Sequence, residues 1–503
     1  MKLRYSLLLG LGLVIGTMPG GYAQISPSEA EIIEPELPAA LPEADLPAAA
    51  DTAADAAEAA AAEAAAEAAE AAAPGLSAIA AYNLGVERYN RSDYTAALEA
   101  FDLAIELDPS LANAYLYRGL IYADRGNYSR ALADLNQAVN LDPDSAKALF
   151  ARGSVYFRQG DSDQALADFN NALEINPDLV GAYLYRGLID TQAGRHELAI
   201  EDFSIAIEID PNNPTAYVLR GFALERVNNH SGAVGDFSRA IELNGDLPRA
   251  YMGRGVAYFH LGLFDSALSD LNEAIRRDST LARAYLNRSH VYFRQGRPNR
   301  ALQDLNRALE LNPSLTEAYM SRGSIRANQG DLQGANQDFA RVLQLNPDSA
   351  IAYKLKGDAL LQAGDPLAAI ANYNEALFLD PSYAEAFYAR GNARMAMGDV
   401  FGAIDDYSQA LAVRPNYLEA FSARGAAYLQ VNQAQNAFQD LTQAISGAPN
   451  TSNPELFYNR GVVRARLGDD AGARRDFERA AELYLQQGEA AGYRQTLNRM
   501  SQL

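Results

Sequence analysis

The sequence of 503 residues contains no cysteine, no tryptophan and only four histidines. The absence of cysteine excludes disulfide bonds, thiolate catalysis and cysteine-ligated zinc or iron–sulfur sites. Basic side chains are also in deficit, because 42 Lys and Arg residues stand against 64 Asp and Glu residues and leave a net charge of −22. A nucleic-acid-binding protein normally carries a basic surface, so we expect no nucleic-acid partner.

Long hydrophobic runs are scarce too, and the one at the N-terminus resembles a secretory signal. Lys2 and Arg4 precede an apolar run over 7–16, and Gly21-Tyr22-Ala23 supplies small residues typical of a cleavage site. We predict a signal peptide over 1–23, cut before Gln24, with an uncleaved anchor as the alternative. The run is much shorter than the roughly 20 residues that span a bilayer. We expect an exported protein, in a bacterial periplasm or else secreted, with no membrane span in the mature chain.

Residues 24–77 have a composition of their own, with 12 acidic and no basic side chains. The segment is rich first in Pro and then in Ala and Glu, which favour helix. It has no stripe of large apolar residues with which to pack on a core. We predict an acidic, solvated and semi-rigid spacer.

A 34-residue period governs most of the remaining chain. A glycine recurs about every 34 residues, as at Gly85, Gly119 and Gly153, and we number each unit so that this glycine is position 8. Position 20 is then Ala in every unit, and position 24 is always a large residue. Position 15 is Gly, Asn or Ser, which suits a left-handed residue at the end of a helix. We predict twelve helix–turn–helix units over 78–487 and an amphipathic capping helix over 488–503. The units start at residues 78, 112, 146, 180, 214, 248, 282, 316, 350, 384, 418 and 454.

Stretches such as Tyr115-Leu-Tyr-Arg-Gly119 and Ala199-Ile-Glu-Asp-Phe203 carry an aromatic, Gly, Ala and aromatic pattern. On these residues the sequence resembles the tetratricopeptide repeat (TPR) family. The resemblance implies an all-α fold, a right-handed superhelical solenoid of about twelve TPR units that binds partner proteins.

One departure from the family pattern is systematic. The usual Leu at position 7 is Arg or Lys in eleven units, and position 23 is Asp in ten. We predict ion pairs between the two helices of a unit, such as Arg118 with Asp134 and Arg152 with Asp168. The ninth unit has Lys356 and Asn372 instead. An anion-binding row is the alternative interpretation of these cations.

The sequence offers little material for catalysis. It has no phosphate loop and no nucleophile elbow. The histidines are His196, His230, His260 and His290, of which the last two fall in adjacent units with Glu225 as the nearest further ligand by position. We predict no catalytic residue, no metal site and no cofactor, and therefore a non-enzymatic protein.

The resemblance places a concave binding surface on positions 2, 5, 9, 12 and 13 of each first helix. In units three to seven the charged residues of this set are basic except for Glu225, whereas in units eight to twelve Lys354 and Arg466 are outnumbered by five acidic residues. The predicted binding residues are Lys147, Phe150, Phe157, Arg158, Phe222, Arg226, Arg249, Met252, Phe259, Arg283, Leu286, Phe293 and Arg294.

A basic, aromatic groove in an acidic protein favours a protein or extended peptide with acidic or aromatic segments. The alternative is that the cations only solvate this face while the Phe side chains pack between helices. The clamp that relatives use for chaperone C-termini is absent, because Lys354 at position 5 is followed by Asp358 at position 9. The acidic spacer is itself a candidate competitor for the groove.

We expect an exported, non-enzymatic scaffold that acts in the assembly of cell-envelope complexes, a role implied by exported relatives. The alternative is a substrate-recruiting accessory subunit of a separate envelope enzyme.

Overall fold

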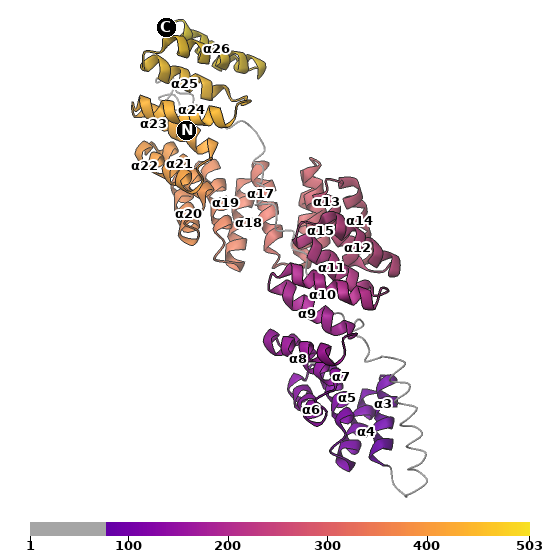
Figure 1. Ribbon diagram of the computed structural model, residues 1–503. Coiled ribbons are helices and arrows are strands. Elements are labelled where there is room, and N and C mark those ends of the chain that lie inside the picture. The colour runs from indigo at the N-terminus through magenta and orange to yellow at the C-terminus, as the bar shows by residue number, and fades with distance from the viewer. Residues whose placement is uncertain (1–76) are drawn as a thin grey trace. The chain divides into compact units, whose positions relative to one another are not determined.

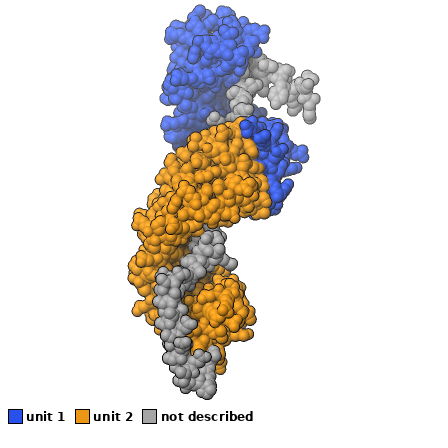
Figure 2. Space-filling model, turned by 90° about the vertical axis from the view of Figure 1, so that its right-hand side faces the viewer, with its two compact units in different colours: residues 1–32, 296–503 blue, residues 33–295 orange. Residues whose placement is uncertain are grey.

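A computed structural model describes residues 77–503, which form 25 helices and no strand (Figure 1). The predicted signal peptide and all of the predicted spacer except Ser77 lie outside the described residues. These divide into two compact units, 77–295 and 296–503, each described by itself below (Figure 2).

Residues 77–295 form six complete helical hairpins and one further helix. The first helices of the hairpins begin at the first residue of each 34-residue period. They are α3 (Ala78–Asn90), α5 (Ala112–Asp124), α7 (Ala146–Arg158), α9 (Val180–Gln192), α11 (Pro214–Arg226), α13 (Pro248–His260) and α15 (Ala282–Arg294). The second helices are α4 (Tyr94–Leu107), α6 (Tyr128–Leu141), α8 (Ser162–Ile175), α10 (His196–Ile209), α12 (His230–Leu243) and α14 (Phe264–Arg277).

Residues 296–503 repeat the same hairpin and end in one extra helix. The first helices are α17 (Thr316–Asn328), α19 (Ala350–Gln362), α21 (Ala384–Met397), α23 (Leu418–Gln430) and α25 (Pro454–Arg466). The second helices are α16 (Pro298–Leu311), α18 (Leu332–Leu345), α20 (Pro366–Leu379), α22 (Val400–Val413), α24 (Ala434–Gly447) and α26 (Asp470–Gln486). The last helix, α27 (Ala490–Met500), packs on α26.

The turn within each hairpin uses a left-handed residue at position 15, as the sequence predicts. Nine of the twelve are glycines, and Ser92, Asn228 and Asn432 adopt φ near +58° or +59° in the other three. This residue ends the first helix, and the second then begins with its own cap. In the third repeat, for example, the Asp161 carboxylate accepts a hydrogen bond from the Gln164 backbone N–H.

Close approach of the two helices depends on the glycine at position 8. A Cβ atom added to Gly187 would lie 2.5 Å from Cε1 of Phe203, the position-24 residue of the same repeat. Phe203 and the position-20 residue Ala199 are fully buried. Small residues on one helix therefore admit a large ring from the other.

Stacking of hairpins buries the core between repeats. Within each compact unit, the second helix of a repeat packs on the first helix of its own repeat and on the first helix of the next repeat, as α8 packs on both α7 and α9. Successive first helices also contact one another, as α11 and α13 do. The predicted all-α solenoid of about twelve helical hairpins is confirmed.

Candidate functional site

The cations at position 7 are held by carboxylates, as predicted. Arg152 donates from Nε and Nη2 to the two carboxylate oxygens of Asp168, at 2.8 and 2.7 Å. Its third nitrogen, Nη1, donates to Asn136 of the preceding repeat at 3.0 Å. The guanidinium thus joins the two helices of one repeat and also ties that repeat to its neighbour, a contact that the sequence analysis missed.

The same pairing of one guanidinium with two carboxylate oxygens recurs along both compact units, so these arginines join the two helices of their repeats. The pairs are Arg118–Asp134, Arg186–Asp202, Arg220–Asp236, Arg254–Asp270, Arg322–Asp338, Arg390–Asp406, Arg424–Asp440 and Arg460–Asp476. In the ninth repeat, by contrast, Asn372 donates to the backbone oxygen of Ala368.

The predicted basic residues all lie on first helices of the compact unit 77–295. We call the side chains at positions 2, 5, 9, 12 and 13 of α7, α9, α11, α13 and α15 the first-helix face. Neighbouring helices of this group contact one another, so the face is continuous. Arg226, Arg249 and Arg294 are exposed on it, and none of the three makes an ion pair or hydrogen bond with a described residue.

The other three basic residues are half-buried. Arg158 lies close enough to Tyr185 to favour its ionised form, although burial is the larger influence and raises the pKa of Tyr185. Lys147 and Arg283 have interactions with other described residues. The accessible positive charge of the face is therefore concentrated on Arg226, Arg249 and Arg294.

The apolar members of the predicted set require a correction. Phe157, Phe222, Met252 and Leu286 are buried, with exposed fractions from 1% to 6%. Phe157 packs edge-on against Tyr185, and Phe222 packs edge-on against Phe237. These four side chains belong to the core between hairpins, where a partner does not reach them.

The remaining aromatic candidates are only partly buried. Phe150 packs against the rings of Phe169 and Tyr185, at centroid distances of 5.8 Å. Phe259 lies beside His260 and Phe264, and Phe293 is also half-buried. Phe150, Phe259 and Phe293 are thus the aromatic side chains of the face with some area open to a partner.

The one acidic residue of the predicted face lies within hydrogen-bonding distance of a histidine. Glu225 lies 3.0 Å from Nδ1 of His230, and burial raises the pKa of its carboxyl group. The His230 ring stacks on His260 with a centroid distance of 4.6 Å. The contact between His230 and His260 could not be predicted from the sequence, because His230 is the first residue of α12 and the periodicity does not define the direction of the turn before that helix.

The pKa of His290 is lowered to about 4 by burial and, second, by the charge of His260. The pKa of His260 is lowered to about 4 by partial desolvation and by His230. Within residues 77–503, no group of three or more His, Asp or Glu side chains is arranged to hold a metal ion.

The first helices of 296–503 carry the acidic residues that the sequence analysis assigned to units eight to twelve, and several are paired. Lys354 forms an ion pair with Asp358 at 3.2 Å, and Glu385 forms one with Arg414. Burial and the nearby Glu489 raise the pKa of Glu455 to about 7. No helix in the described part of the chain combines the length and apolar character that a membrane crossing requires.

Family models described as TPR repeat or tetratricopeptide repeat match 119–160, 146–179, 187–228, 219–282, 289–357, 357–398 and 391–432. Together these ranges cover well over half of the sequence. The chain belongs to the tetratricopeptide repeat family. Tetratricopeptide repeat scaffolds are generally non-catalytic and bind proteins or peptides, so the fold is that of a protein-interaction scaffold.

Several solved structures are similar to this tetratricopeptide repeat chain at low sequence identity. The Cut9–Hcn1 hetero-tetramer of APC/C matches at 13% identity, covering 84% of this chain and 96% of that one, with a TM-score of 0.47. Yeast Tom70 matches at 15% identity over 84% and 96%, with a TM-score of 0.40. YrrB, described as a TPR protein with an unusual peptide-binding site, matches at 27% identity over 38% and 98%, with a TM-score of 0.32. No curated protein sequence matches the chain.

Proposed function

We propose that the protein is an exported, non-enzymatic scaffold that binds partner proteins or extended peptide segments through the first-helix face. Its proposed location is the periplasm of a bacterium, on the evidence of the N-terminal sequence alone. The proposed role is the assembly of cell-envelope complexes.

The observation that carries the binding proposal is the set of exposed guanidinium groups of Arg226, Arg249 and Arg294. Nine position-7 arginines of the chain hold carboxylates, whereas these three make no ion pair or hydrogen bond with a described residue. They lie on one continuous face, in a protein of net charge −22. A local excess of positive charge attracts acidic segments and raises their association rate.

The partner chemistry follows from the side chains that remain accessible. Guanidinium groups bind carboxylates with two parallel hydrogen bonds. The half-buried ring of Phe293 lies one position before the exposed Arg294, so an apolar and a charged contact are neighbours on the face. An extended segment with Asp or Glu between aromatic or aliphatic residues is the partner that this arrangement fits best.

The test is partner capture from an envelope extract with the chain that begins at Gln24. One variant changes Arg226, Arg249 and Arg294 to Glu. The matched control changes Arg130, Arg239 and Arg276 to Glu, which alters the net charge equally but on second helices of the same compact unit.

We expect a specific partner to be lost with the first variant and retained with the control. Its binding to the unmodified chain should weaken as salt concentration rises, because screening reduces charge attraction. Equal retention by both variants would contradict binding through the first-helix face.

A further inference from the structure

The second helices of repeats eight to eleven carry an exposed surface unlike that of the other repeats. Positions 18, 22, 25 and 29 lie on one side of each second helix, because they are separated by three or four residues. We call these four positions the second-helix stripe. In α20 the stripe consists of Leu367, Ala371, Asn374 and Phe378, and all four residues are exposed.

In every other second helix except α6, this stripe carries at least one charged residue. In α4 it contains Glu99, Asp102 and Glu106, and in α10 it contains Glu197, Glu201 and Glu208. Across α18, α20, α22 and α24, by contrast, sixteen stripe positions include a single charged residue, Asp405. The stripes of α18 and α24 are built mainly from Gln, Thr and Ser.

Large apolar side chains stand at the centre of this uncharged area. Leu367 and Phe401 occupy the same position in α20 and α22, with exposed fractions of 67% and 70%. Phe378 is 81% exposed at the other end of α20, and Met397 and Val413 are also exposed. The helices α20 and α22 both pack on α21, so their stripes are neighbours within the compact unit 296–503.

The hairpin interiors of repeats nine and ten do not use the exposed rings of Phe378 and Phe401. The position-24 residues Tyr373 and Tyr407 already fill the interior of the two hairpins, and they are buried. Exposed clusters of large apolar side chains are typical of interaction surfaces, and Phe and other aromatic residues are enriched at the core of such surfaces.

We propose that the stripes of repeats eight to eleven form the interface between two copies of this chain, related by a twofold axis. The sixteen stripe positions offer a single charge, that of Asp405, to attract an oppositely charged partner, so their counterpart is itself largely uncharged and apolar. The stripe is such a surface, and a twofold axis brings the same patch of each copy together. Two copies of a protein with net charge −22 also meet most favourably where that charge is absent.

The interface is independent of the first-helix face, which lies in the other compact unit. Self-association through the stripes would present two first-helix faces in one assembly. Two linked copies bind a partner with two sites more tightly than one copy does.

The test is sedimentation equilibrium of the chain that begins at Gln24, from about 1 to about 100 µM, where a dimer of ordinary affinity dissociates. Phe378→Glu and Phe401→Glu each place two charges in a symmetric interface. The matched control is Leu485→Glu, a 65% exposed residue outside the stripes. Circular dichroism of all three variants reports whether the helices persist.

We expect the unmodified chain and Leu485→Glu to dimerise, and each Phe variant to weaken the dimer by at least about tenfold. Because the interface carries little charge, dimerisation should persist or strengthen when salt rises from about 50 to about 500 mM. A chain that stays monomeric throughout would overturn the proposal. So would a dimer that both Phe variants leave unchanged, or one that salt dissociates.

Discussion

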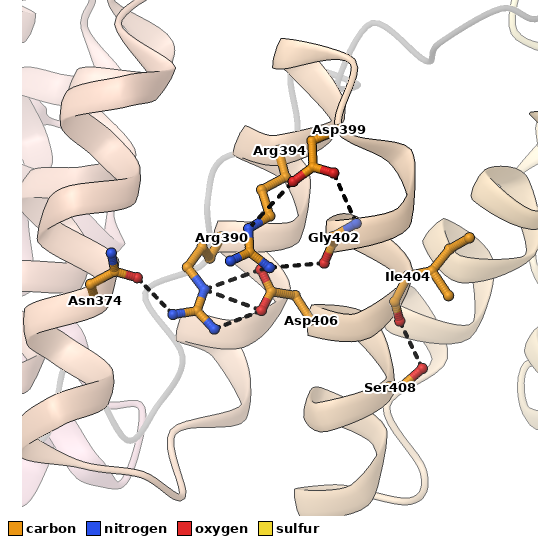
Figure 3. Close-up of polar contacts among 8 residues, drawn as sticks. All are labelled: Asn374, Arg390, Arg394, Asp399, Gly402, Ile404, Asp406 and Ser408. Atoms are coloured by element: carbon orange, nitrogen blue, oxygen red, sulfur yellow. Dashed lines mark hydrogen bonds and ion pairs between the residues drawn. The ribbon is translucent and has the colours of Figure 1, made fainter.

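The buried carboxylate of Asp406 is the strongest test of the arginine–aspartate pairs (Figure 3). Asp406 is fully buried and accepts hydrogen bonds from Nε and Nη2 of Arg390, the shorter at 2.7 Å. It also lies 3.0 Å from Nη1 of Arg394. Asp406→Ala removes one carboxylate and leaves two guanidinium groups without their main partner.

The structure sets the size of the effect. Breaking a buried ion pair by removing one partner costs roughly 3–5 kcal/mol. The lower end applies here, because Arg390 keeps its 2.7 Å hydrogen bond to Asn374 and Arg394 keeps the Gly402 carbonyl at 3.0 Å. We expect the free energy of local opening to fall by about 3 kcal/mol, which is about a hundredfold in the opening equilibrium.

Hydrogen exchange of the backbone amides of α21 and α22 measures this opening equilibrium locally, which suits a stack of repeats. Asp405→Ala is the control, because Asp405 is exposed on the same helix and has no ion pair or hydrogen bond with a described residue. If Asp406→Ala changed exchange no more than Asp405→Ala, the pairs would have no stabilising role.

Three further predictions concern packing, pH and the N-terminal segment. Gly187→Ala should destabilise α9 and α10 by about 1–3 kcal/mol, because its Cβ would lie 2.5 Å from Phe203. Gly235→Ala places its Cβ in free space and should stabilise α12 by about 0.5–1 kcal/mol. Hydrogen exchange of the backbone amides of these helices measures both changes. The pKa of His290 is lowered from its ordinary value to about 4, so the unfolded state binds the proton first and the stability of repeats six and seven should fall as pH falls from about 7 to about 4. His290→Gln should flatten that dependence in pH-resolved exchange, and an unchanged slope would contradict it. If the acidic segment 24–73 competes for the first-helix face, deletion of 24–75 should tighten partner binding in a titration, and equal affinity would refute the competition.

The repeat architecture could be predicted closely because the turn within each hairpin needs a left-handed backbone conformation, which only a few residue types adopt readily. Position 15 needs a left-handed residue, and Gly, Asn and Ser reveal it in all twelve repeats. The pairing of position 7 with position 23 was also predictable, since Lys356 and Asn372 depart from the pattern together. The third contact that most of these arginines make was not predictable, because the partner at position 25 of the preceding repeat varies among Asp, Asn and Ser.

The candidate site was harder to predict than the fold. Helical spacing assigns a residue to a face but does not say how deeply a neighbouring hairpin covers it. Phe222 and Met252 therefore resembled surface residues in the sequence and are buried between hairpins. Arg226, Arg249 and Arg294 are accessible because their long side chains extend beyond the packed rings.

Photocrosslinking in the living cell tests the central claim most directly. A photoreactive amino acid is placed in turn at Arg226, Arg249 and Arg294, and in control chains at Arg130, Arg239 and Arg276. Binding through the first-helix face predicts covalent capture of the same partner from the first three positions and none from the control positions. Capture only from the control positions, or from neither set, would contradict that account.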